Sequence, residues 1–281
     1  MGSMERSWQL NWQRSWQHIG ERVDRIGGVA LYTAGTVRRF YETLVAILSV
    51  GLRFRWLARP AVVNVVIRQI YFTGVQSVPW VIIIALAAGV LTVYNIVIFA
   101  KSVEDLSLIG RLVSGLLVQE VAPLLVTIFL LARSGVAVVT EIGTMHVRGE
   151  DVVLRSLGVS VNEYLLWPRV MAFTICGLIL TFVFLLISIW FGGMVVAWSY
   201  ELNLIDYFIE VRRGTTIEEM GFLLAKGALY PMLCSIMLLS QGCRVGRDPN
   251  LIPVRATYGV LGSLMLVLLV DVLLVLVKEV L

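Results

Sequence analysis

The residues from which most enzyme sites are built are scarce in this chain. It has two histidines, His18 and His146, and three cysteines, Cys176, Cys234 and Cys243, in 281 residues. The cysteines are odd in number, lie in or beside apolar runs and show no CxxC spacing, so we expect them to be inert packing residues. The sequence also has no GxxxxGK(S/T) phosphate loop, no HExxH zinc motif and no GxSxG nucleophile motif. We therefore expect no enzyme and no cofactor or metal in this chain; any ATP and Mg²⁺ would bind a separate ATPase subunit.

Charged residues are also few, at 15% of the chain, whereas hydrophobic residues reach 58%. A soluble domain of this length rarely has such a composition, which is typical of a membrane protein. The formal net charge of +4 could indicate binding to nucleic acid. The basic residues, however, are sorted by side of the expected membrane and form no patch with interleaved aromatic residues, so we expect no nucleic acid partner.

Five apolar runs are long enough to cross a membrane, because about twenty helical residues at about 1.5 Å each span the hydrocarbon core. They are Val78–Ala100, Leu112–Ala132, Val170–Trp198, Gly221–Leu239 and Gly259–Val277. The fourth run is the weakest, because Lys226 and Pro231 interrupt it. We therefore predict an all-α integral membrane protein with five transmembrane helices.

The distribution of lysine and arginine predicts the orientation, because these residues are retained on the cytoplasmic side. Of the 23 in the chain, seventeen lie in residues 1–77, Arg133–Arg169 and Gln241–Tyr258, which this topology puts on one side. Five lie on the other side, in loops shared with acidic residues. We therefore predict a cytoplasmic N-terminus, a C-terminus on the periplasmic side, and one sizeable external loop at Ser199–Met220.

Residues 1–58 are expected to form amphipathic interfacial helices ahead of a membrane domain at residues 59–281. Trp8, Trp12 and Trp16 recur every four residues and so line one helix face, which is typical of a helix in the headgroup region. The alternative is an unstructured leader. Arginines set among apolar residues from Val23 to Leu57 indicate a second interfacial helix.

The polar segment Ala132–Arg169 lies between the second and third expected spans, yet its pattern is helical. Its apolar residues at helical spacing are Val138, Val139, Ile142 and Met145. Gly149 precedes Glu150 and Asp151, which favour the start of a second helix, and Gly158 marks its end. We therefore predict two short helices at the membrane surface.

Several motifs in this region and beyond it resemble those of the MlaE/YrbE permeases, membrane subunits of ABC transporters that work with MCE proteins to move lipids. The motifs are RQIYFTGV (Arg68–Val75), LVQEVAPLL (Leu117–Leu125), ARSG (Ala132–Gly135), TEIGTM (Thr140–Met145), SLGV (Ser156–Val159) and WPR (Trp167–Arg169). The resemblance runs from roughly Arg53 to the C-terminus and is less clear before it.

The resemblance implies a homodimeric permease of the bacterial inner membrane, with a plastid envelope as the alternative. Its implied partners are an ABC ATPase carrying ATP and Mg²⁺, a periplasmic MCE-domain protein, membrane phospholipid as substrate and, as an open option, a small accessory subunit. In such systems a short cytoplasmic helix sits in a cleft of the ATPase. The residues expected at that contact are Glu141, Gly143, Thr144, Met145 and Glu150. The alternative is that the connector only caps the helix bundle.

Ionisable residues inside membrane spans cost about 2.5 to 3.5 kcal/mol each at a helix centre and usually face a cavity or a partner. Glu120, Lys226 and Asp271 are the ones in this chain. One hypothesis is that they flank a pocket for a lipid headgroup, in which Lys226 attracts phosphate. The alternative is a structural pairing of the lysine with an acid between two helices.

The first expected span contains candidates for the wall of an acyl-chain cavity. They are Leu91 and Tyr94, together with Gly89 and Ile98. Tyr94 could instead mark the outer membrane interface. The permeases that the chain resembles often carry Arg just before the glutamate of the second span, where this chain has Gln119. One positive contact expected for a headgroup is therefore missing.

Three transporter classes are compatible with this topology. An ABC importer permease for a soluble solute would need a connector pattern that Asp151, Gly158 and Pro168 match only loosely. An ion-coupled secondary transporter could use the ionisable residues in the spans, but five spans without a visible inverted repeat argue against it. An ATP-driven lipid permease is the prediction. Five helices are few for enclosing a wide path, which also favours a second copy of the chain.

Overall fold

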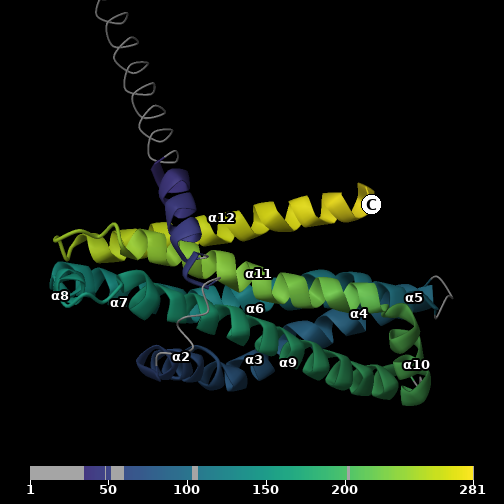
Figure 1. Cartoon of the computed structure of the whole chain (residues 1–281). Coiled ribbons are helices and arrows are strands. Elements are labelled where there is room, and N and C mark those ends of the chain that lie inside the picture. Colours follow the sequence, from purple (N-terminus) through teal and green to yellow (C-terminus); the bar gives the residue numbers. More distant parts are fainter. Residues whose placement is uncertain (1–34, 48, 52–59, 103–106, 201–202, 281) are drawn as a thin grey trace, which may run out of the picture. The chain divides into compact units, whose positions relative to one another are not determined.

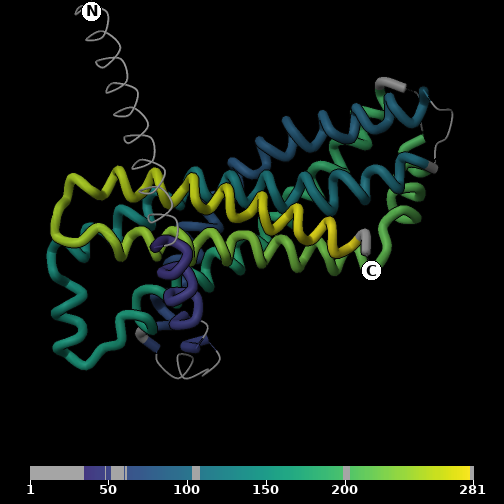
Figure 2. The backbone as a smooth tube through the Cα atoms, turned by 90° about the horizontal axis from the view of Figure 1, so that it is seen from above, coloured from purple at the N-terminus to yellow at the C-terminus, as the bar shows by residue number. Residues whose placement is uncertain are grey.

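A computed structural model describes residues 35–47, 49–51, 60–102, 107–200 and 203–280 (Figure 1 and Figure 2). The chain divides into two compact units, Met1–Val45 and Ala46–Leu281. The described residues form helices and turns and no strand, which confirms the all-α prediction. In the first unit the described residues, 35–45, are helical. The tryptophan-bearing helix expected at residues 8–16 and the expected boundary at residue 58 lie outside the described residues and stay predictions.

Five helical stretches of the second unit are long and apolar enough to span a membrane. They are Val62–Ser102, Leu108–Val147, Asn162–Trp198, Ile217–Gly242 and Leu251–Lys278. Each contains one of the five expected spans, so their number and order are confirmed. The fourth stretch, α11 (Ile217–Gly242), continues through Pro231, whose ring packs against α9 (Trp167–Tyr200) at Gly177. A Cβ on Gly177 would lie 2.2 Å from the Pro231 Cγ, so only glycine fits there.

The first stretch changes direction before it reaches the expected span. α2 (Pro60–Thr73) is followed by Gly74 and a short 3₁₀ turn, η2 (Val75–Ser77). α3 (Val78–Ile84) then begins at the residue where the first span was predicted to start, with a proline in its first turn. As a result α2 is turned out of line with α3 and α4 (Val90–Ser102), and is seen nearly end-on in Figure 1.

Turns of π-helix interrupt the long helices at four places in the described part of the chain. They are η3 (Ala85–Gly89), η4 (Val113–Val121), η5 (Leu131–Gly135) and η6 (Asn162–Leu166). α5 (Ser107–Leu112) precedes η4, and α6 (Ala122–Leu130) joins η4 to η5. Such turns often occur at functional sites. Here η4 carries Gln119 and Glu120, and η5 carries Arg133.

The connector differs from its prediction in one respect. α7 (Val136–Val147) follows η5 without a break, so the first of the two expected helices is the end of the second long stretch and not a separate helix. Gly135, the residue between them, keeps helical angles, with φ −63°. The second helix is confirmed as α8 (Glu150–Ser156), flanked by Gly149 and Gly158 with φ of +72° and +74°. These left-handed angles favour glycine and end the helices sharply.

The expected external loop Ser199–Met220 is largely helical, since α10 (Leu204–Gly214) occupies half of it and the ends of α9 and α11 reach into it. α10 packs on α5 at the end of the unit opposite α8 (Figure 1). Gly110 and Gly214 let the two backbones touch, because a Cβ on Gly110 would lie 2.0 Å from the Glu210 carbonyl oxygen. Tyr207 and Val211 bury the inner face of α10.

The centre of the second unit is formed by α9 and α11, which pack against each other and against most of the other long helices. Small residues allow the helices to approach closely, since a Cβ on Gly89 would overlap Ser188 and one on Gly192 would lie 2.8 Å from Val93. α12 (Leu251–Val280) packs on α11 and α7, and the apolar core of its span is mostly exposed. That face of α12 is therefore free to contact lipid or another copy.

Candidate functional site

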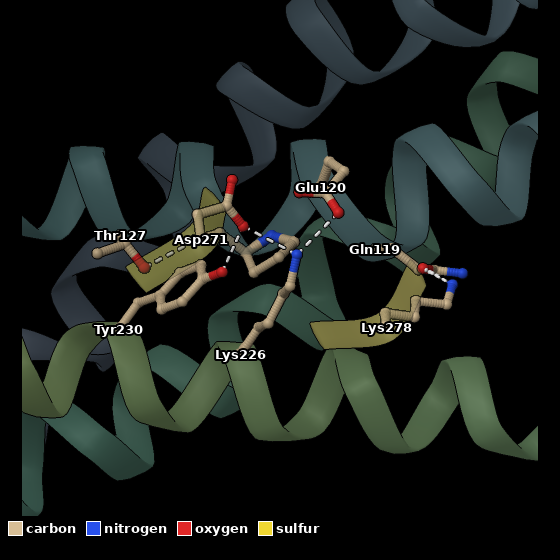
Figure 3. A network of polar contacts seen from close by, with 8 residues as sticks. Gln119, Glu120, Thr127, Lys226, Tyr230, Asp271 and Lys278 are labelled. Carbon is tan, nitrogen blue, oxygen red and sulfur yellow. Dashed lines mark hydrogen bonds and ion pairs between the residues drawn. The ribbon is translucent and has the colours of Figure 1, made fainter. Parts of the chain in front are cut away.

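A cluster of ionisable side chains joins three helical segments of the unit (Figure 3). The Nζ of Lys226 on α11 lies 2.8 Å from Glu120 Oε1 on η4 and 2.8 Å from Asp271 Oδ1 on α12. Tyr230, one turn after the lysine, donates its hydroxyl to the same Asp271 oxygen at 2.5 Å. One ammonium group therefore bridges two carboxylates that lie far apart in the sequence.

The cluster is largely buried, and its members satisfy one another. The side chain of Lys226 is 4% exposed, that of Asp271 13% and that of Glu120 29%. Removing such charges from water is costly unless each finds a partner, and here each does. The structure thus brings together the three ionisable residues singled out from the sequence. It adds Tyr230, whose position four residues after Lys226 puts both on one helix face and was the signal available in the sequence.

A cavity of about 210 Å³ opens beside this cluster, with polar groups and an apolar wall. Its lining residues are Gln119, Glu120, Phe222, Lys226, Leu274, Val275 and Lys278. Lys278, near the end of α12, donates a hydrogen bond to Gln119 Oε1 (Figure 3), and its Nζ lies 5.7 Å from the centroid of the Phe222 ring. The lining therefore holds two ammonium groups and one carboxylate, next to hydrocarbon side chains.

Leu91 and Tyr94, the candidates for an acyl-chain wall, lie on α4 and do not line this cavity. Leu91 is 61% exposed and faces away from the core of the unit, whereas Tyr94 is half-buried. Within one copy of the chain they are therefore separate from the Lys226 cluster. Their contact with a lipid stays a prediction.

The residues of α7 that were expected to meet an ATPase are mostly engaged within the chain. Glu141 Oε1 lies 2.7 Å from the Nη2 of the buried Arg169. Gly143 is buried against the loop that follows α11, Thr144 donates its hydroxyl to a carbonyl one turn earlier, and Met145 lines a cavity. The side chain of Glu141 is nevertheless 54% exposed, and the role of these residues in coupling stays a prediction.

α8, by contrast, has one anchored face and one exposed face. The carboxylate of Asp151 lies 3.6 Å from Nε2 of His146 on α7, which holds α8 against α7, and 3.9 Å from Nη2 of Arg155 within α8. Glu150 is only loosely paired, at 3.8 Å from Arg148 Nη1. The exposed face carries the apolar side chains Val152, Val153 and Leu157, which are 60%, 57% and 71% exposed. An apolar surface of this kind at a polar end of a membrane protein indicates a binding site for another protein or for the membrane surface.

Cys243 lies just beyond the end of α11, near the anchored face of α8. Burial raises the pKa of its thiol to about 11, and the nearby Asp151 carboxylate acts in the same direction. The arginines Arg155 and Arg169 oppose this rise. The thiol is therefore protonated and unreactive at neutral pH, in agreement with the expected packing role of the cysteines.

With this geometry described, the chain can be compared with known proteins. A family model described as Permease MlaE matches residues 66–277, which include the Lys226 cluster, most of the five long stretches and the whole connector. The chain belongs to the MlaE permease family. It is 25% identical over 211 residues to a probable ABC transporter permease protein of Rickettsia felis, covering 75% of this chain and 81% of that protein.

Two further relatives of this MlaE-family chain match shorter stretches. A probable ABC transporter permease protein of Synechocystis is 33% identical over 138 residues, which are 48% of this chain and 51% of that protein. An intermembrane phospholipid transport system permease protein MlaE of Haemophilus influenzae is 29% identical over 159 residues, which are 53% of this chain and 60% of that protein. The chain is therefore a multi-pass permease subunit of an ABC transporter. Such a subunit is typically not catalytic and works with an ATPase partner.

Proposed function

We propose that this permease moves phospholipids between the inner membrane of a bacterium and a periplasmic MCE-domain protein, and so maintains the lipid asymmetry of the envelope. The observation that carries the proposal is the cavity beside Lys226, which combines two ammonium groups with an apolar wall. A phospholipid has the matching parts, an anionic phosphate and hydrocarbon chains. The name of the H. influenzae relative, a phospholipid transport permease, points in the same direction.

Lys278 is the cation best suited to hold the phosphate. Lys226 shares its charge with two carboxylates, whereas the hydrogen-bond partner of Lys278 is the neutral amide of Gln119. The ammonium of Lys278 also lies over the ring of Phe222, at the apolar side of the cavity. The permeases that the chain resembles often carry an arginine at the position of Gln119. In this chain Lys278, from α12, would supply that positive charge instead.

A second copy of the chain would complete the path for the acyl chains. The fifth span exposes a row of large apolar side chains, among them Met265, Leu269 and Leu273, at 65%, 60% and 52% exposure. A homodimer built on exposed faces of this kind would add hydrocarbon surface next to the headgroup cavity. Leu91 and Tyr94 would then contact the acyl chains of the lipid if α4 of either copy faced this path.

The ATPase would dock on α8, with Glu150, Val153 and Leu157 at the contact and the TEIGTM segment of α7 behind them. The ATPase, not this chain, would bind ATP and Mg²⁺. Because Leu108–Val147 is one helical stretch, movement of α8 and α7 would be transmitted through α6 to Glu120 on η4. Movement of both copies in this way would open or squeeze the lipid cavity. The connector and the N-terminus would face the cytoplasm, and the C-terminus the periplasm.

Site-specific photo-crosslinking tests the lipid site. A benzoylphenylalanine at position 222 in the complete transporter, reconstituted with radiolabelled phosphatidylglycerol, should form a covalent lipid adduct. The variant Lys278→Gln should reduce the yield about tenfold, because a charge-assisted hydrogen bond to phosphate is lost. The matched control, Lys101→Gln, changes a lysine outside the cavity lining and should leave the yield unchanged. Equal adduct yields in all three proteins would overturn the headgroup assignment.

Co-purification tests the ATPase contact. The double variant Val153→Asp, Leu157→Asp should lose the ATPase from the purified complex, because charges would replace the exposed apolar face of α8. Ile205→Asp is the matched control, since Ile205 is an aliphatic residue 67% exposed on α10, at the opposite end of the unit. Retention of the ATPase by the α8 double variant would contradict this contact.

An ion-coupled transporter remains the second candidate, because a lysine between two carboxylates is an arrangement that can exchange a proton or a cation. That function requires transport by the chain alone under an ion gradient. Lipid movement in liposomes that contain the permease without any ATPase, driven by a proton or sodium gradient, would favour this candidate over the ATP-driven one.

A further inference from the structure

A second and larger cavity lies at the end of the unit that carries the connector. Its volume is about 670 Å³, and its walls come from α2, from η5 and α7, and from η6 and α9. It shares no lining residue with the cavity beside Lys226. The proposed transport of phospholipid does not use it.

The lining of this second cavity carries an excess of positive charge. It includes three arginines, Arg68, Arg133 and Arg169, and one carboxylate, Glu141. The residues that precede α2 in the sequence, 52–59, contain Arg53, Arg55 and Arg59 and no acid. The described walls therefore do not supply the negative charge that would balance the cavity.

Two of these arginines are held in place by the protein. Arg133 Nη1 donates to the Phe72 carbonyl oxygen at 3.1 Å and to Ser77 Oγ, and its Nη2 donates to Gln76 Oε1 at 3.3 Å. Arg169 Nη1 donates to the Leu165 carbonyl oxygen at 2.6 Å. The partners of Arg133 are neutral, so they fix its guanidinium group without cancelling its charge, whereas Arg169 also pairs with the Glu141 carboxylate at 2.7 Å.

Arg169 also has an unused donor. The residue is 3% exposed, and its Nε has no hydrogen-bond partner among the described residues, although Nη2 is paired with Glu141. Buried donors nearly always find a partner, because an unsatisfied one costs free energy. The Arg169 side chain therefore lacks one acceptor among the described residues, although its Nε is enclosed and is not itself open to the cavity.

The mouth of the cavity has the composition of a membrane interface. Arg68 is exposed, with its guanidinium carbon 5.7 Å from the centroid of the Phe72 ring. On the same helix, α2, the apolar side chains Ile67, Tyr71 and Phe72 are 59%, 53% and 46% exposed. A helix with exposed apolar and aromatic residues beside arginines is typical of the headgroup region of a bilayer.

We propose that this cavity binds the phosphate of an anionic lipid headgroup from the leaflet on the connector side. Arg169 and Arg133 would hold the phosphate inside the cavity, Arg68 would contact it at the mouth, and the apolar face of α2 would lie along the acyl chains. Arginine suits this role, since its planar donors match phosphate geometry. Such a lipid would join α2 to α7 and α9, and so tie the interfacial helix to the connector.

Photo-crosslinking from inside the cavity tests the proposal. Tyr164 lines the cavity, and a benzoylphenylalanine in its place is reconstituted in vesicles that contain phosphatidylcholine together with phosphatidylglycerol. We expect the adduct to form with phosphatidylglycerol in strong preference. Arg169→Gln should lower that yield about tenfold and Arg68→Gln somewhat less, because each removes a charge-assisted contact.

Two controls keep this test separate from the transport site. Arg148→Gln removes an arginine that lies at the same end of the unit but does not line the cavity. Lys278→Gln changes a residue of the other cavity. Both variants should leave the yield of the lipid adduct at position 164 unchanged. Equal adducts with phosphatidylcholine, or yields unaffected by Arg68→Gln and Arg169→Gln, would overturn the proposal. Loss of the lipid adduct in the presence of millimolar inorganic phosphate would overturn the lipid assignment in favour of a soluble anion.

Discussion

The Lys226 cluster and the connector-side cavity are built from the same kinds of side chain in opposite balance. At the Lys226 cluster, one buried ammonium group faces two carboxylates and a tyrosine hydroxyl. In the connector-side cavity, three arginines face the single carboxylate of Glu141, and a buried guanidinium donor has no partner among the described residues. The first set is satisfied within the chain, whereas the second keeps an excess of positive charge, on which the proposal of a bound anion rests. Charge balance, and not the number of charged residues, distinguishes side chains that satisfy one another from side chains that keep charge for a ligand.

The largest effect is expected from removing the cation of the balanced cluster. Lys226→Met leaves Glu120 and Asp271 as neighbouring carboxylates without their cation, which should lower stability by about 3 kcal/mol. Thermal denaturation in detergent, followed by gel filtration, measures this loss. Lys278→Met is the control and should cost less than about 1 kcal/mol, because that lysine is exposed and bonded to a neutral amide. A melting curve of Lys226→Met equal to that of wild type would refute the view that the cluster is a self-satisfied unit.

The next effect concerns the unbalanced cavity. Glu141→Gln removes the only carboxylate in its lining and leaves Arg169 buried without its ionic partner, at a cost of about 2 kcal/mol. Phosphatidylglycerol should reduce this cost, because its phosphate can replace the lost carboxylate, whereas it should not rescue Lys226→Met. The comparison is made by melting both variants in nanodiscs with and without phosphatidylglycerol. An equal rescue of the two variants, or of neither, would break the distinction between the cavities.

A charge exchange in the smaller cavity gives a third and smaller effect. In the Lys278→Gln background, Gln119→Arg should restore most of the lipid adduct at position 222, since it returns a cation to the same cavity wall. The expected recovery is about tenfold, equivalent to about 1.4 kcal/mol of binding free energy. Failure of the arginine to recover the adduct, in a protein that still folds by gel filtration, would mean that Lys278 does not act through its charge.

The smallest effect is on the reactivity of Cys243, which reports on the charges around Arg169. Because the pKa of this thiol is raised to about 11, its rate of alkylation should be low at neutral pH. The rate should increase with pH until the pH exceeds that pKa. Arg169→Gln removes one of the positive charges that oppose the rise, so it should slow alkylation further. Mass spectrometry of the Cys243 peptide gives the rate. Rapid alkylation at pH 7 would show that the α8 end is open to solvent.

Most of the fold could be predicted because it depends on local properties of the sequence. The five spans follow from the length of the apolar runs, and the start of the first at Val78 follows from Gly74 and the proline after it. The second connector helix follows from Gly149 and Gly158, which need positive φ. The continuity of α7 with the second span was missed because no residue between them forbids a helix, and the polarity of the segment alone suggested a break.

The sites were harder to predict, because they depend on contacts between distant parts of the chain. Glu120 and Lys226 are separated by 106 positions, and no local pattern says that they meet. In the sequence, Lys278 counts only as one of the basic residues of the external side. In the structure its ammonium group bonds to Gln119 and adds a positive charge to the cavity. Arg68 and Arg169 likewise appeared only as motif and topology residues, since the sequence does not reveal that α2 and α9 bring them to one cavity.

The most direct test of the central claim is the movement of a fluorescent phospholipid in proteoliposomes that contain the permease with its ATPase, measured with and without ATP. We predict ATP-dependent movement that is reduced by Lys278→Gln and abolished by the double variant Val153→Asp, Leu157→Asp, while Ile205→Asp behaves as wild type. Movement that is indifferent to ATP and to the α8 variant, and that instead follows an imposed ion gradient, would contradict an ATP-driven phospholipid permease.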